Sequence, residues 1–271
     1  MKGILPMSEK NTAPINVSLT QIPDSIDKTA EGLLVKPAQT IGSTISDLFH
    51  LVFGFISFNA EKQRIRYSLK LDAYKKKVEN EINAIPSDKI IEPNLQVAGQ
   101  ALENSKFCIE SDELTTMFSK LIASSMNSDT ISNVHPSFPE ILKQMAPQDA
   151  HLLLEFKKNS MLPICKYRIA ISESGYHYPL SEIYLNDSLI NLEPTYYSSS
   201  LASLKRLGLI DIDFLNFLID DDKYSIYISH TYYSRLRYKY GVKNVSIEKG
   251  NAELTPLGES FIKVCVPDKF D

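Results

Sequence analysis

The side chains most capable of chemistry are scattered along this 271-residue chain. The five histidines lie far apart, at His50, His135, His151, His177 and His230. None of them pairs at a spacing typical of metal ligands, and His151 is expected to be a surface or helix-capping residue. The acidic run 220–222 suggests a cation site, but three consecutive residues share no face of a helix or strand, which favours a solvated turn.

Phosphate-binding and nucleophile motifs are also missing from the sequence. It contains no Gly-x-x-x-x-Gly-Lys, Gly-x-Gly-x-x-Gly or Gly-x-Ser-x-Gly pattern. Ten glycines in the whole chain are few for an enzyme that cradles phosphates. We therefore predict a protein that is not an enzyme, with no catalytic, cofactor-binding or metal-binding residues.

Two adjacent segments carry the best candidates for contacts with other molecules. The first is the almost wholly apolar run 48–58, which is shorter than the roughly 20 residues of a spanning helix. It is either a helix buried in the fold or in an oligomer, or a hairpin that inserts into a membrane when the protein is triggered. The candidate membrane or partner contacts are Leu48, Phe49, Leu51, Val52, Phe53, Phe55, Ile56 and Phe58.

The second segment is a strongly charged helix predicted over residues 60–85. Its apolar residues Ile65, Leu69, Tyr74, Val78 and Ile82 are expected to form one packed stripe, which leaves the opposite face basic. That face is either solvated or a contact for phosphate or anionic lipid. The candidate anion contacts are Lys62, Arg64, Arg66, Lys70, Lys75, Lys76 and Lys77, together with Arg235 and Arg237 in a later segment.

These segments belong to a predicted helical bundle over residues 26–158. Its centre is three consecutive helices between Ser111 and Phe156, the first with Leu114, Met117, Phe118, Leu121 and Ile122 on a buried face. A capping box over 137–140 is expected to begin the second, and Pro147 the third. A short helix from Pro93 is expected to turn Leu95, Ala98 and Leu102 inward.

The chain changes character after residue 158. A strand is predicted over 163–170, a turn over 173–179, and a helix over 197–207 that is closed by Gly208. A strand at 209–212, an inserted helix near 229–240 and a helix capped by Thr255 follow. This order predicts a winged-helix-like part. Because the first half of the helix at 197 has no Lys or Arg, DNA reading is less expected than packing or protein binding.

The central helices resemble a known family. The runs Leu114…Phe118-Ser-Lys-Leu121-Ile122…Asn127 and His135-Pro-Ser-Phe-Pro-Glu140…Pro147-Gln-Asp-Ala150 are similar to the Abi-alpha, or abortive infection alpha, family of bacterial proteins. The resemblance covers roughly residues 30–265 and implies a role in phage defence, with no reaction to carry over. One departure is Ala146, where a Ser cap is expected; Ala costs about 1 kcal/mol of capping.

The sequence thus predicts a mainly α protein: a mobile arm (1–25), a helical bundle (26–158) and an α+β winged-helix-like part (159–271). The expected role is a non-enzymatic sensor or effector that binds a protein partner or itself. The alternatives are a membrane-perturbing effector using 48–58 and a winged-helix nucleic-acid-binding regulator.

Charge and cysteines agree with this expectation. A net charge of −4 gives no general attraction to nucleic acid or anionic lipid. Three unpatterned cysteines, Cys108, Cys165 and Cys265, are typical of a reducing compartment. The apolar run after Lys2 is too short for a signal peptide. We expect a cytoplasmic protein, with membrane association on activation left open.

Overall fold

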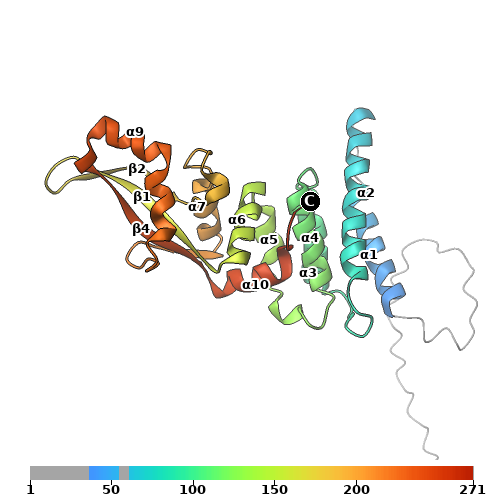
Figure 1. The fold of residues 1–271 in the computed structure, drawn as a ribbon. Helices are drawn as coiled ribbons and strands as arrows, with labels where there is room; N and C mark the ends of the chain where they lie inside the picture. Colours follow the sequence, from blue (N-terminus) through green and yellow to red (C-terminus); the bar gives the residue numbers. More distant parts are fainter. Residues whose placement is uncertain (1–36, 55–60, 271) are drawn as a thin grey trace, which may run out of the picture. The chain divides into compact units, whose positions relative to one another are not determined.

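The computed structural model describes residues 37–54 and 61–270 of the chain (Figure 1). The fold over these residues is mainly helical, with one antiparallel sheet in its C-terminal half. The helices of the first half are α1 (Pro37–Phe53), α2 (Glu61–Asn83), α3 (Leu95–Ser105), α4 (Asp112–Ser124), α5 (Phe138–Lys143) and α6 (Pro147–Lys158). The predicted arm 1–25 and the predicted helix start at 26 lie outside the described residues.

Helix α4 is central to the helical half, because it contacts α2, α3, α5, α6 and the last helix of the chain. The predicted face of α4 is confirmed: Leu114, Met117, Phe118, Leu121 and Ile122 are all buried. The Ser111 hydroxyl caps the helix by accepting a hydrogen bond from the Leu114 amide at 3.2 Å. Helix α4 is therefore a core helix, buried around most of its circumference.

The helix starts after α4 differ from the sequence prediction in their chemistry. The capping box at Ser137 is wrong, since that residue has helical backbone angles and its hydroxyl pairs with His135 Nδ1 at 2.7 Å. Helix α6 does begin at Pro147. Ala146, the residue before it, has no hydroxyl to cap the helix. Asp149 provides a different capping contact, because its Oδ2 accepts a hydrogen bond from the Ala146 amide at 3.0 Å.

Helix α3 starts at Leu95, two residues after the predicted start at Pro93. Asn94, and not a residue before Pro93, caps this helix by accepting a hydrogen bond from the Gln96 amide at 3.1 Å. Ala98 and Leu102 are buried as predicted, but Leu95 is 60% exposed. Leu95 is the first residue of α3, so no earlier turn of the helix lies beside its side chain.

The sheet has strand order β2-β1-β4-β3, and each neighbouring pair is antiparallel. Its strands are β1 (Met161–Ala170), β2 (Tyr176–Ile183), β3 (Ile210–Asp213) and β4 (Val245–Leu254). The predicted strand at 163–170 is confirmed. The turn predicted over 173–179 is wrong from Tyr176 onward, because Pro179 belongs to β2, an edge strand that tolerates proline.

Four further helices surround the sheet, namely α7 (Ser198–Arg206), α8 (Asp222–Ser229), α9 (Thr231–Tyr240) and α10 (Pro256–Cys265). Helices α8 and α9 pack on it through buried tyrosines. The Tyr167 hydroxyl donates to the Tyr227 carbonyl at 3.0 Å, and the Tyr227 hydroxyl donates to the Pro163 carbonyl at 2.7 Å. Burial raises the pKa of Tyr227 well above its usual value, so both rings are neutral core residues with satisfied hydroxyls.

The element order of the predicted winged-helix-like part is found in the structure. Helix α7 is followed by Gly208 with a φ of 74°, then by β3, and Thr255 caps α10. The inserted helix predicted near 229–240 is α9, and α8 precedes it. The winged-helix assignment itself stays a prediction, as does the boundary at 158, across which α6 contacts β1 and α7.

Candidate functional site

The apolar run predicted for contacts packs against α2 through one face of α1. Phe49 and Phe53 are 5% and 6% exposed, and their ring centroids lie 5.5 and 6.3 Å from that of Tyr74. Val52 is buried on the same face. These side chains are therefore core residues of the α1–α2 pair.

The remaining members of the apolar run have different environments. Leu48 is half-buried and packs against the core, whereas Leu51 is 62% exposed. Phe55, Ile56 and Phe58 lie outside the described residues. Within the described part of the chain, no helix combines the length and apolar character needed to cross a bilayer.

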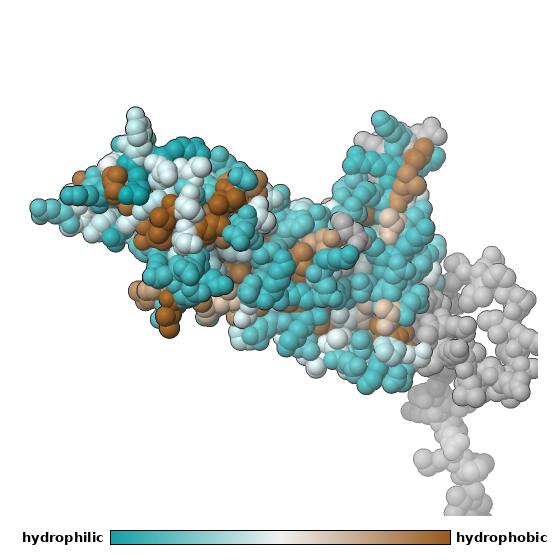
Figure 2. All heavy atoms as spheres, in the orientation of Figure 1, coloured by the Kyte–Doolittle hydropathy of each residue, from teal (hydrophilic) through white to brown (hydrophobic). Residues whose placement is uncertain are grey.

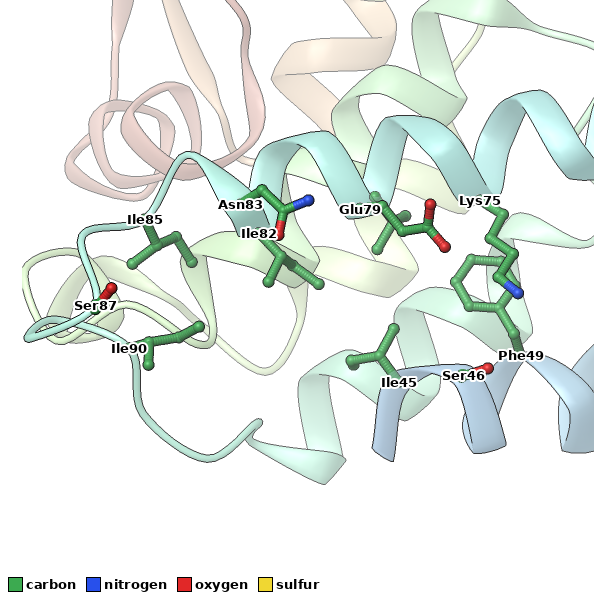
Figure 3. Close-up of a pocket in the computed structure, with 11 residues that line it drawn as sticks. Ile45, Ser46, Phe49, Lys75, Glu79, Ile82, Asn83, Ile85, Ser87 and Ile90 are labelled. Atoms are coloured by element: carbon green, nitrogen blue, oxygen red, sulfur yellow. The ribbon is translucent and has the colours of Figure 1, made fainter. Parts of the chain in front are cut away.

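One candidate contact from each of the two predicted segments lines a pocket between α1 and α2 (Figure 3). Phe49 of α1 and Lys75 of α2 both face this cavity of about 210 Å³. Its other walls are mostly apolar, including Ile45, Val78 and Ile82. Figure 3 shows Lys75 and Glu79 on the same stretch of α2, so the pocket combines apolar walls with one charge of each sign.

Three of the predicted anion contacts on α2 are paired within the protein. Arg66 pairs with Glu110 at 2.6 Å, and Lys70 and Lys77 both pair with Asp112 at 3.4 Å. The Lys77 ammonium also donates to the Asp112 carbonyl at 3.0 Å and to the Thr116 hydroxyl at 2.9 Å. These cations hold α2 against the start of α4.

These cations also change the titration of Asp112. Burial is the largest single influence and opposes ionisation, but the charges and hydrogen bonds of Lys77 and Lys70 together outweigh it. The pKa of Asp112 therefore lies below its ordinary value of 3.8.

The other predicted cations are not gathered with this cluster. Lys62, Arg64, Lys75 and Lys76 make no ion pair with a described acid. The predicted contacts Arg235 and Arg237 lie on α9, which packs on α8 and β4. Arg235 is exposed, and the guanidinium of Arg237 lies 5.6 Å from the Tyr233 ring centroid.

The predicted single stripe of α2 is wrong, because the helix has two apolar faces. Tyr74, Val78 and Ile82 are buried, but Ile65 and Leu69 are 54% and 65% exposed. Tyr74 lies five residues after Leu69, so the two side chains point in directions about 140° apart around the helix axis. Ile65 and Leu69 therefore point away from the core.

Most of the chain matches one protein family. The model described as Abortive infection alpha matches residues 66–265, which confirms the predicted resemblance. The chain belongs to the Abortive infection alpha family. No curated protein matches the chain, and no solved structure matches it.

In this Abortive infection alpha protein, the outward-facing apolar residues of α2 are accompanied by lysines. Lys62, Leu69 and Lys76 recur every seven residues, and Ile65 lies one helical turn before Leu69, so all four share one face. Figure 2 shows the corresponding brown stripe along α2. We call Lys62, Ile65, Leu69 and Lys76 the outer face of α2.

Two histidines of the family member have roles that sequence reasoning missed. His151 is half-exposed, pairs with Glu113 at 3.3 Å and meets the Phe270 ring edge to face, with centroids 5.3 Å apart. His230 is buried and caps α9, where its Nδ1 accepts a hydrogen bond from the Tyr232 amide at 3.2 Å. Among the described residues, no three His, Cys, Asp or Glu side chains are placed to hold a metal ion together.

Proposed function

We infer that this Abortive infection alpha protein is a phage-defence protein that acts without enzymatic chemistry, by binding a partner protein or itself. Family membership supports the defence role. The observation that carries the mechanism is the outer face of α2, where Ile65 and Leu69 are 54% and 65% exposed on a helix whose opposite face is already packed.

Burial of the apolar side chains of this face would favour the docking of another protein on α2. Two apolar side chains one turn apart form a continuous patch, and burial of their exposed portions contributes about 1–2 kcal/mol each. Anchors at i and i+4 on a helix are the pattern by which helices bind protein grooves. Lys62 and Lys76 flank the patch, and the exposed Asp72 lies seven residues after Ile65 on the same face, so the matching surface is apolar with a rim of mixed charge.

The two alternative functions have less support. A membrane-perturbing effector needs the 48–58 run to leave the protein, yet Phe49 and Phe53 pack on Tyr74 and Val52 is buried. A winged-helix nucleic-acid regulator needs cations on the first half of α7, and that half carries serines instead.

A plaque assay tests the proposal. Cells that express the protein from its own locus, with its neighbouring genes, are infected beside cells that carry the Ile65→Ser/Leu69→Ser variant. Because removal of both side chains weakens docking at least about tenfold, we expect the variant to lose most of its protection while its expression and helix content are unchanged.

The matched control is Phe107→Ser, which removes an 81% exposed aromatic ring from the turn between α3 and α4. This variant is expected to protect as well as the parent. Full protection by the Ile65→Ser/Leu69→Ser variant, at equal expression, would refute the docking role of the outer face.

A further inference from the structure

The loop between β3 and α8 exposes large apolar side chains. Leu215, Phe217 and Ile219 are 91%, 51% and 98% exposed. Figure 2 shows brown side chains at this loop, which extends below the sheet in Figure 1. Such exposure is unusual for three neighbouring apolar residues, and exposed apolar patches mark interaction surfaces.

The loop is held in one conformation by its hydrogen bonds. Asp213 accepts from the Leu215 amide at 2.7 Å and from the Asn216 side chain at 2.6 Å. The Asn251 side chain donates to the Asn216 carbonyl at 2.9 Å, and the Leu218 amide donates to the Tyr224 hydroxyl at 3.0 Å. Because the loop is already ordered, docking costs little conformational entropy.

Acidic residues precede and follow the apolar side chains in the sequence. The segment 211–222 contains five aspartates, at 211, 213, 220, 221 and 222, and no Lys or Arg. Only Asp221 has a described cationic partner, Lys249. We call residues 211–222 the acidic loop.

A surface of opposite charge lies at the C-terminal end of α9. Tyr238 and Val242 are 95% and 59% exposed there, beside the exposed cations Arg235, Lys239 and Lys243. The segment 223–247 contains five Lys or Arg residues and no Asp or Glu. We call residues 235–243 the basic tip.

The basic tip is also held in place. The Asn244 side chain donates to the Tyr240 carbonyl at 2.7 Å, and the Tyr233 hydroxyl donates to the Val245 carbonyl at 3.2 Å. Both surfaces therefore combine ordered backbone with exposed apolar side chains. The basic tip carries only cations, whereas the aspartates of the acidic loop outnumber the two lysines beside its rings, Lys166 over Phe214 and Lys249 over Phe217.

We propose that the acidic loop of one copy docks on the basic tip of a second copy, so that the protein self-associates head to tail. This inference rests on the proposed function and names the partner as the chain itself. One copy cannot satisfy both surfaces, because α8, about 12 Å long, and α9 separate the loop from the tip. The contact joins two different surfaces, so it forms chains or closed rings.

The charges favour a second copy over other partners. A nucleic acid or an anionic membrane would contact the basic tip alone and would leave the exposed apolar side chains of the acidic loop uncovered. A second copy uses both surfaces at once, with apolar contact at the centre and opposite charges around it.

Charge reversal provides the test, with sedimentation velocity on the full chain at low salt. The loop variant is Asp220→Lys/Asp222→Lys, and the tip variant is Arg235→Glu/Lys239→Glu. Each alone places like charges at the contact and is expected to weaken self-association at least about tenfold. An equimolar mixture of the two variants, and one chain that carries all four changes, are both expected to recover it.

Two further variants keep the test independent of folding defects. Leu215→Ser/Ile219→Ser leaves the hydrogen bonds of the loop backbone and all charges unchanged, and it is expected to weaken association. Glu173→Lys, an exposed charge in the β1–β2 turn, is expected to leave association unchanged.

The inference is overturned if the parent is monomeric at low salt, or if the mixture of loop and tip variants does not associate. It is also overturned if tip reversal abolishes binding to duplex DNA or anionic vesicles without changing association. None of these results bears on the plaque assay with Ile65 and Leu69, so the proposed function can stand when head-to-tail association fails.

Discussion

Gly258 fixes how closely the last helix approaches the sheet. It lies in the first turn of α10, and a Cβ at this position would overlap the carbonyl oxygen of Leu209. Its amide donates to Thr255 Oγ1 at 3.0 Å, and the same hydroxyl donates to the Gly208 carbonyl at 2.6 Å. These contacts join the turn after α7 to the start of α10.

Two glycine substitutions are expected to act in opposite directions. Gly258→Ala must move α10 away from Leu209 and should lower the free energy of unfolding by about 1–3 kcal/mol. Gly99→Ala should raise it by about 0.5–1 kcal/mol, because Gly99 is inside α3 and no atom lies within 4 Å of an added Cβ. Urea unfolding of the two variants beside the parent measures both changes. Equal effects of both variants would contradict the close approach at Gly258.

At the scale of elements, α2 is held to α4 by ion pairs whose strength depends on pH. Lys70 and Lys77 lower the pKa of Asp112 against the opposing effect of its burial. A carboxyl group with a lowered pKa stabilises the fold above its ordinary pKa of 3.8. That contribution is lost as the pH falls through the lowered value.

The pH dependence can be tested with a double variant. In Lys70→Met/Lys77→Met the pKa of Asp112 should return toward or above its ordinary value, so the variant should lose less stability than the parent between pH 5 and pH 2. Urea midpoints across this range give the comparison. Lys76→Met, which removes a cation without a described acidic partner, should follow the parent. A double variant that follows the parent too would show that Asp112 is not the group responsible.

The helices were the part of the fold that the sequence predicted best. The apolar spacing of α4 and the Thr255-Pro256 start of α10 are local signals, and the structure retains both. The Ser137 cap was wrong because His135 competes for the same hydroxyl. Residues 176–179 were assigned to a turn, whereas their place on an edge strand depends on the whole sheet.

The candidate contacts were harder to predict, because exposure depends on neighbours distant in sequence. Ile65 and Leu69 are as apolar as Val78 and Ile82, and only their angular position on α2 separates them. Residues 214–219 are apolar except for Asn216, and a short apolar run of this kind resembles a buried strand. Hydrogen bonds to Tyr224 and Asn251 instead hold this segment as an exposed loop.

At the scale of the whole molecule, the fold offers two kinds of surface around a conventional core. The outer face of α2 is apolar with lysines, and the acidic loop and basic tip are complementary to each other. The match to the Abortive infection alpha family begins inside α2, at residue 66, and extends to the last residue of α10. We propose that phage defence depends on contacts made on these surfaces.

The most direct test of the docking role is photo-crosslinking from position 69 in living cells. A photo-reactive phenylalanine derivative replaces Leu69 in one strain and Phe107 in another, and both strains are irradiated before and during phage infection. The account predicts a discrete protein adduct, either to a second copy or to one partner, from position 69 and not from position 107. Equal or absent crosslinking from the two positions, in cells that remain protected from phage, would contradict it.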